Sequence, residues 1–139
     1  MPLEALGDPM PNDNDINAMP AIRVIMMPKD TNALGTIFGG VILSYIDQAG
    51  AVEAHRSVHG KIVTVSMREV VFHAPVYVGD LVSFFTRTKR LGSTSVTVEV
   101  TVEAERGHPG GPKAKVTEAE MVFVHVGPDG RPTPIPRPV

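Results

Sequence analysis

Strict alternation of apolar and polar residues runs through much of the chain and predicts strands. Between residues 96 and 103, valines occupy every second position, and threonines and glutamates occupy the positions between them. A period of two places alternate side chains on opposite faces of a strand. The same pattern predicts strands at residues 21–27, 81–89 and 116–126, and one more whose buried face carries Val63, Val65, Met67 and Val71. We therefore expect about five antiparallel strands.

A single segment departs from this alternation. From Gly40 to about Val58, apolar residues recur at three- and four-residue spacing, and Gly60 follows as an end signal. This spacing predicts one helix of about five turns. One long helix among about five strands favours an α+β fold in which an antiparallel sheet wraps around a central helix.

The chain is long enough for one domain with one core. It has 139 residues, and its prolines gather near both ends. Residues 1–20 contain four acidic side chains and no lysine or arginine, and residues 127–139 contain five prolines. We expect an acidic N-terminal tail at 1–20, a folded domain at 21–126 and a proline-rich C-terminal tail at 127–139.

Composition excludes several classes of function. The absence of cysteine excludes a disulfide scaffold, an iron–sulfur cluster and a cysteine nucleophile, and the five histidines lack the spacing of a metal site. A net charge of −2 argues against a nucleic-acid partner. No apolar run approaches the length of a membrane helix, and no secretory signal opens the chain, so we expect a cytoplasmic protein without a membrane partner.

Asp47 is the most informative acidic residue of the predicted helix. Its neighbours three and four positions away are Leu43, Ser44, Gly50 and Ala51, so no cation of the helix can pair with it. A solvated or strand-bonded carboxylate and a functional carboxylate both remain open. Glu53 differs, because Arg56 follows three residues later and a surface ion pair is expected.

Adjacent glycines precede the predicted helix. Gly39 and Gly40 leave room for a ligand to approach the unpaired N–H groups of the first turn, whose positive dipole end favours an oxyanion. A sharp loop-to-helix turn without any ligand is the alternative.

Residues 27–50 resemble the acyl-CoA thioester hydrolases of the hot-dog fold, in particular the YciA-type and cytosolic brain-type acyl-CoA hydrolases. The specific part of the resemblance is the spacing of Asn32, the pair Gly39 and Gly40, and Asp47. It continues through residues 63–65, Phe72, Pro75 and residues 78–80, 92–95 and 117–119. The resemblance covers nearly all of the predicted domain and neither tail.

The resemblance implies a hot-dog fold and hydrolysis of acyl-CoA to a free carboxylate and coenzyme A, a reaction of lipid metabolism. It assigns Asp47 as general base or nucleophile, Asn32 as its partner across a dimer interface, and Gly39 and Gly40 as the oxyanion region. It also implies a homo-oligomer in which dimers assemble further into a hexamer. The reaction requires no metal and no cofactor, because coenzyme A is part of the substrate.

Coenzyme A carries several phosphates, and basic residues precede the glycine- and serine-containing turn at residues 92–95. The resemblance implies that this turn holds the nucleotide, and that Thr64 contacts the pantetheine. The residues expected to bind are Arg90, Gly92, Ser93 and Thr94. A strand end kept soluble by its charges is the alternative.

Two other functions remain open at this point. A hydratase or dehydratase of the same fold would require a histidine that works with the helix carboxylate. A module that binds or senses acyl-CoA without turnover would be expected to lack the helix acid or to carry a fused DNA-binding segment, and the sequence has neither feature.

Overall fold

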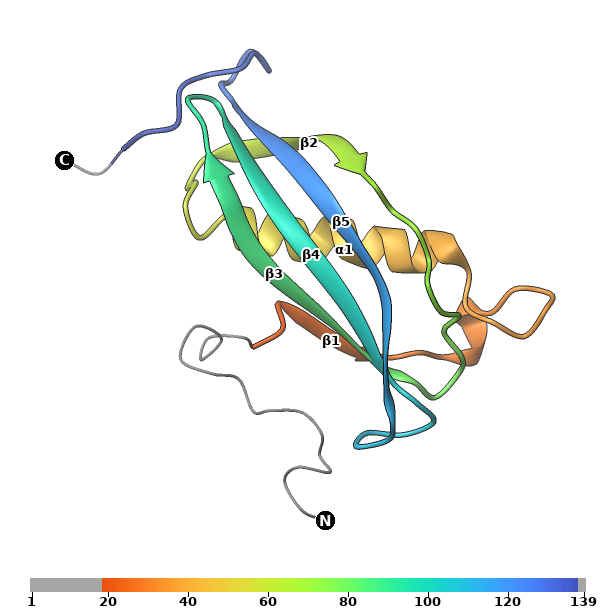
Figure 1. Ribbon diagram of the computed structural model, residues 1–139. Coiled ribbons are helices and arrows are strands. Elements are labelled where there is room, and N and C mark those ends of the chain that lie inside the picture. Colours follow the sequence, from red (N-terminus) through yellow and green to blue (C-terminus); the bar gives the residue numbers. More distant parts are fainter. Residues whose placement is uncertain (1–18, 138–139) are drawn as a thin grey trace.

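A computed structural model describes residues 19–137, which form a five-stranded antiparallel sheet and one long helix (Figure 1). Residues 1–18, which make up most of the predicted N-terminal tail, lie outside the described range. The strands are β1 (Ile22–Ile25), β2 (Lys61–Arg68), β3 (Leu81–Leu91), β4 (Ser95–Glu105) and β5 (Lys113–Val126). A short 3₁₀ turn, η2 (Pro28–Asp30), precedes the helix α1 (Gly39–Ala54).

The sheet has the strand order β1-β3-β4-β5-β2, and every neighbouring pair is antiparallel. Strands β3, β4 and β5 are the longest and form its centre, while β1 and β2 are its edges. Figure 1 shows the sheet curling around α1, which lies across its concave face. The predicted α+β arrangement, a sheet wrapped around one helix, is confirmed.

The core lies between this concave face and α1. The four valines of β4 that alternate with polar residues, Val96, Val98, Val100 and Val102, are all at most 1% exposed, as predicted. On α1, Gly50 lies against the sheet so closely that a Cβ atom there would stand 3.0 Å from the Phe123 ring. The small residues of the helix therefore let it approach β5 closely.

The predicted buried face of β2 is wrong. Val63 and Val65 are 39% and 53% exposed, because Val65 forms a β-bulge between Thr64 and Ser66 and the pairing with β5 shifts there. The bulge lets Ile62 and Met67, which have opposite parity, both pack on the core. It also leaves Thr64 on the face that looks toward α1.

The helix ends earlier than predicted, at Ala54 instead of near Val58. Its last turn tightens, since the amides of Arg56 and Ser57 bond to carbonyls three residues back. Glu53 is 8% exposed and accepts hydrogen bonds from the hydroxyls of Thr86 and Thr88 on β3, in addition to its contact of 3.6 Å with Arg56. The predicted ion pair with Arg56 is therefore present, but Glu53 is a buried group that also bonds to β3, and not a surface residue.

The segment after β5 turns back and packs on the domain. Val126 forms a bridge with Pro132, and Ile135 is 4% exposed within the core cluster. Residues 127–137, which the sequence assigned to a tail, therefore lie against the body of the protein.

Candidate active site

Asp47 lies in the middle of α1 on the side that approaches β2. Its Oδ1 accepts a hydrogen bond of 2.7 Å from the hydroxyl of Thr64. Among residues 19–137 no lysine or arginine forms an ion pair with this carboxylate, and Oδ2 accepts no hydrogen bond. Two residues expected at the site are thus joined, and one carboxylate oxygen stays available for chemistry.

Packing between the helix and the sheet produces this contact. Gly50, one turn after Asp47, sits against Phe123 of β5, and Phe123 is paired with Thr64 across the β5–β2 ladder. The close approach of α1 at Gly50 therefore carries Asp47 to the flank of β2. A larger residue at position 50 would push the helix away and separate the two side chains.

Gly39 and Gly40 form the first turn of α1. Phe38 precedes them without a side-chain cap, and within the described part of the chain their two N–H groups have no hydrogen-bond acceptor. A Cβ atom on Gly40 would meet nothing within 4 Å, whereas Gly39 faces the ring of Phe72 at 3.5 Å. The two N–H groups are thus unpaired donors at a helix start, and the space on the Cβ side of Gly40 is open.

Asn32 lies in the loop before the helix, where its amide shapes the chain. Its Nδ2 donates to the Thr36 hydroxyl at 2.8 Å, and its Oδ1 accepts from the amides of Leu34 and Thr36. None of these bonds reaches Asp47. Within one chain, Asn32 and Asp47 are therefore not joined by a hydrogen bond.

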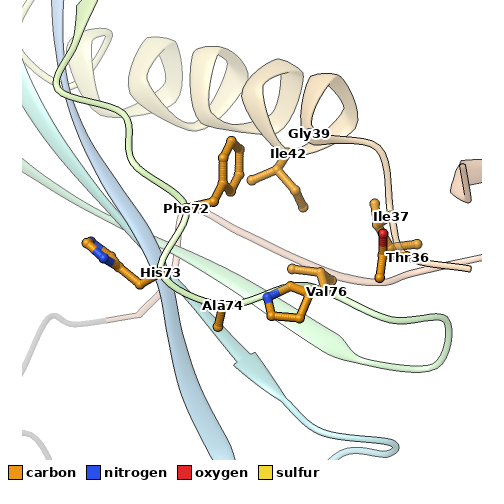
Figure 2. A pocket seen from close by; sticks show the side chains of 9 residues that line it. Thr36, Ile37, Gly39, Ile42, Phe72, His73, Ala74 and Val76 are labelled. Atoms are coloured by element: carbon orange, nitrogen blue, oxygen red, sulfur yellow. The ribbon is translucent and has the colours of Figure 1, made fainter. Parts of the chain in front are cut away.

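A pocket of about 340 Å³ opens beside the start of α1. One wall comes from the loop and first turn of the helix, and the other comes from the segment that connects β2 to β3. Figure 2 shows the Phe72 ring turned toward α1 near Gly39 and Ile42. The lining is mostly apolar, with Thr36 and His73 as its polar side chains, and consists of residues Thr36, Ile37, Gly39, Ile42, Phe72, His73, Ala74, Pro75 and Val76.

Sequence reasoning did not identify this pocket. Phe72 and Pro75 carried part of the family resemblance, but nothing in their spacing showed that the segment folds back over the helix start. The contact depends on long-range pairs such as the bond of 2.8 Å from the Ile37 amide to the Val76 carbonyl.

The residues expected to bind the nucleotide lie elsewhere. The turn between β3 and β4 consists of Gly92, Ser93 and Thr94, and Arg90 is the second-last residue of β3 and is exposed. Figure 1 places this turn at the end of the sheet where α1 finishes, away from the pocket at the helix start. One chain does not bring the turn and the pocket together.

The described residues contain no group of three or more histidine, aspartate or glutamate side chains placed to hold a metal ion. None of their helices is long and apolar enough to cross a membrane.

Comparison with known proteins identifies the family. Residues 34–110, which include the pocket, Asp47 and the β3–β4 turn, match the Thioesterase superfamily. The chain belongs to this family. The thioesterase is 41% identical to the acyl-CoA thioester hydrolase YciA of Salmonella typhimurium over 126 residues, 89% of this chain and 95% of that one.

Solved structures support the same assignment. A hexameric hotdog fold thioesterase of Campylobacter jejuni is 43% identical with a TM-score of 0.77, and the match covers 84% of this chain and 90% of that one. A hexameric broad specificity acyl-coenzyme A thioesterase is 38% identical with a TM-score of 0.79, over 86% and 82% of the two chains. The predicted hot-dog fold and family are confirmed, while the roles of the individual site residues stay predictions.

Proposed function

We propose that this thioesterase hydrolyses acyl-CoA to a free carboxylate and coenzyme A, with Asp47 as the catalytic carboxylate, and that it acts in the cytoplasm. The observation that supports this proposal is the environment of the Asp47 carboxylate. It is a partly exposed carboxylate on the central helix, free of any cation among the described residues, and held at one oxygen by Thr64. A carboxylate without a salt bridge keeps its lone pairs for a reacting group.

The reaction begins at the thioester carbonyl. Asp47 either takes a proton from the attacking water or attacks the carbonyl carbon itself, and negative charge then develops on the carbonyl oxygen. The N–H groups of Gly39 and Gly40 are suited to donate hydrogen bonds to that oxygen. Collapse of the intermediate breaks the carbon–sulfur bond, and the thiolate of coenzyme A leaves and takes up a proton. When water attacks, the free carboxylate is formed in this step; when Asp47 attacks, a mixed anhydride is formed, and a water molecule then hydrolyses it to the free carboxylate and restores Asp47. Neither a metal nor a cofactor takes part in these steps.

The complete site is proposed to contain two subunits. Seven residues separate Gly40 from Asp47, which is about 10 Å along an α-helix. This distance is too long for one carbonyl to contact both groups closely. A partner subunit that supplies Asn32, Gly39 and Gly40 to face Asp47 removes the difficulty.

The edge strand β2 is the surface through which such a partner would bind. Within residues 19–137 no strand lies beside its outer hydrogen-bonding groups, and Val63 and Val65 are exposed on it. Pairing two β2 strands would join two sheets edge to edge and cover these valines. The two similar structures described above are hexameric, and we propose a trimer of such dimers for this chain.

The pocket beside Gly39 is the proposed site of the acyl chain. A thioester carbonyl bound at the helix start would direct its acyl group to the apolar wall formed by Ile42, Phe72 and Val76. The coenzyme A part of the bound substrate would extend from this region toward a β3–β4 turn. There the nucleotide is proposed to be bound by Arg90, Gly92, Ser93 and Thr94.

A panel of acyl-CoA esters from acetyl to palmitoyl, assayed for release of free thiol, tests the function. The wild-type protein should hydrolyse at least part of the panel, and Asp47→Asn should lose a hundredfold or more in kcat. Gln48→Ala is the matched control, since Gln48 is exposed on the same helix turn and bonds only to Ser44 among the described residues. A folded Asp47→Asn protein with wild-type kcat would disprove the assignment of the carboxylate.

A further inference from the structure

The C-terminal segment covers the turn between β3 and β4. After β5 the chain reverses at residues 127–130, where Gly130 has a φ of 79° and its amide bonds to the Gly127 carbonyl. Residues 131–137 then run back along the end of the β3–β4 hairpin, as Figure 1 shows. The side chain of Ile135 is buried there and anchors the segment.

Three hydrogen bonds occupy the three carbonyl groups of the turn. The Ile135 amide donates to the Ser93 carbonyl at 2.8 Å, and the Arg137 guanidinium donates to the Gly92 carbonyl at 2.5 Å. The Thr94 carbonyl accepts from the amide of His125 at 2.8 Å. His125 is in turn fixed by the segment, because its Nδ1 lies 2.8 Å from the Thr133 carbonyl and its own carbonyl accepts from the Thr133 amide.

The donors of Ser93 and Thr94 in the same turn remain unused. Within residues 19–137, the amides and the hydroxyls of Ser93 and Thr94 form no hydrogen bond. The Gly92 amide donates to the Ser95 carbonyl at 2.7 Å, so the free donors of the turn are the N–H and O–H groups of Ser93 and Thr94, beside carbonyls that are all engaged. Such an arrangement is suited to an anion with several acceptor oxygens, such as a phosphate.

The charged side chains at this end of the hairpin also favour binding of an anion. Arg87 and Lys89, on β3, are paired with Glu99 and Glu120. In contrast, neither Arg90 nor Arg137 forms an ion pair with any described carboxylate. The bond from Arg137 to a neutral carbonyl leaves its charge uncompensated and its other N–H groups available. Two guanidinium groups without carboxylate partners thus flank a turn of free donors.

We propose that Arg137, from the C-terminal segment, binds a phosphate of coenzyme A at the β3–β4 turn, and that Ile135 positions that turn. The inference rests on the proposed function, because it takes acyl-CoA as the ligand. Arg137 would add a charge-assisted hydrogen bond to those of Arg90, Ser93 and Thr94. Ile135 would act indirectly, by holding residues 92–94 in the conformation that keeps their donors free.

The decisive experiment compares Arg137→Ala with Arg131→Ala in the full chain. Arg131 lies in the same segment and carries the same charge, but it stands 3.8 Å from Asp129 and its side chain is 84% exposed. Affinity for coenzyme A is measured by calorimetry. KM and kcat are measured for butyryl-CoA and for the butyryl thioester of N-acetylcysteamine, which lacks every phosphate.

Arg137→Ala should weaken coenzyme A binding and raise KM for butyryl-CoA by about tenfold, with kcat and both constants for the short thioester unchanged. Arg131→Ala should change coenzyme A affinity by less than about twofold. Raising the salt concentration should weaken coenzyme A binding more in the wild type than in Arg137→Ala, because screening acts on the contact that the variant has lost. Equal affinities of the Arg137 and Arg131 variants would overturn the proposal.

Ile135→Ala tests the positioning role. It should raise KM for butyryl-CoA and leave the short thioester unaffected in protein shown to be folded by its melting curve. An equal rise in KM for both substrates would show general destabilisation of the protein and would overturn the positioning role of Ile135.

The proposed hydrolysis of acyl-CoA and the proposed role of Arg137 can be disproved separately. A wild-type protein that hydrolyses neither thioester contradicts the proposed function, while coenzyme A affinity still tests Arg137. A wild-type enzyme active on butyryl-CoA, together with an Arg137→Ala protein of unchanged coenzyme A affinity, contradicts only the inference drawn from the C-terminal segment.

Discussion

The Thr64 hydroxyl on β2 donates a hydrogen bond of 2.7 Å to Oδ1 of Asp47 on α1, across 17 residues of sequence. One oxygen of the carboxylate is thereby fixed, and the orientation of the other follows from the planar geometry of the group. We regard Thr64 as a positioning residue, because its contact is with Asp47 and not with a reacting atom.

Replacing Thr64 by valine should therefore lower kcat about five- to tenfold, as expected for the loss of one hydrogen bond to a charged group. Thr64→Ser keeps the hydroxyl and should retain most of the activity, which steady-state kinetics on one acyl-CoA would show. Ser66→Ala, on the opposite face of β2, serves as the control. Equal kcat values for the valine variant and the wild type would remove Thr64 from the positioning of Asp47.

The contrast between central and edge strands explains which elements could be predicted from the sequence. Strands β3, β4 and β5 have neighbours on both sides, and in β4 the alternation of Val96 to Val102 translated directly into a buried face. At the edge, the bulge at Val65 exchanges the two faces of β2, and hydrophobic periodicity carries no signal for one inserted residue.

The site residues also differ in whether the sequence pattern could indicate them. Asp47 stood out in the sequence because no cation is placed three or four residues from it. Its partner Thr64 could not be derived from that pattern, since the contact depends on how closely Gly50 lets α1 approach β5. Ile135 is a similar case, because one apolar residue among prolines forms no periodic pattern, yet it is buried.

Glu53 is predicted to stabilise the docking of α1 on β3. Glu53→Ala would leave the hydroxyls of Thr86 and Thr88 without their acceptor and should cost about 2 kcal/mol in the free energy of unfolding. Arg56→Ala removes only an exposed partner and should cost less than about 0.5 kcal/mol. Urea denaturation of both variants measures the difference, and similar losses would mean that the ion pair matters as much as the threonines.

Glu120 is predicted to make stability depend on pH in the acid range. Hydrogen bonds from Lys89 on β3 and Arg68 on β2 lower the pKa of Glu120 to about 2 from 4.5. Because the folded pKa lies below the unfolded value, the stabilising effect is complete above pH of about 4.5 and is lost as the pH falls through about 2. Glu120→Gln should thus melt lower than the wild type at pH 7 and converge with it near pH 2. A melting difference independent of pH would exclude this origin.

The pocket beside Gly39 is predicted to set the acyl-chain preference. Ala74 lines it and is only partly buried, so Ala74→Phe should fill part of the space without disturbing the core. We expect kcat/KM to fall for the longest acyl-CoA esters that the wild type accepts and to stay within about twofold for acetyl-CoA. A uniform loss across the panel would argue against an acyl chain in this pocket.

The last prediction concerns the sharing of the site between subunits. Asn32 forms its hydrogen bonds with its own loop, and none reaches Asp47 in the same chain. If the site takes Asn32 from one subunit and Asp47 from its partner, then Asn32→Ala and Asp47→Ala proteins should each be inactive alone and should complement each other when co-expressed. Random pairing makes about half of the dimers mixed, and each mixed dimer has one intact site and one doubly mutated site.

About a quarter of the wild-type activity should therefore return. Two different affinity tags, purified in sequence, isolate assemblies that contain both variants, and in these about half of the dimers are mixed, so about a quarter of the wild-type activity should remain. A double variant carrying Asn32→Ala and Asp47→Ala in the same chain, co-expressed with Asp47→Ala chains, is the control, because none of its assemblies contains an intact site. Tagged assemblies of the two single variants that remain inactive would place both residues in one subunit or remove Asn32 from the site.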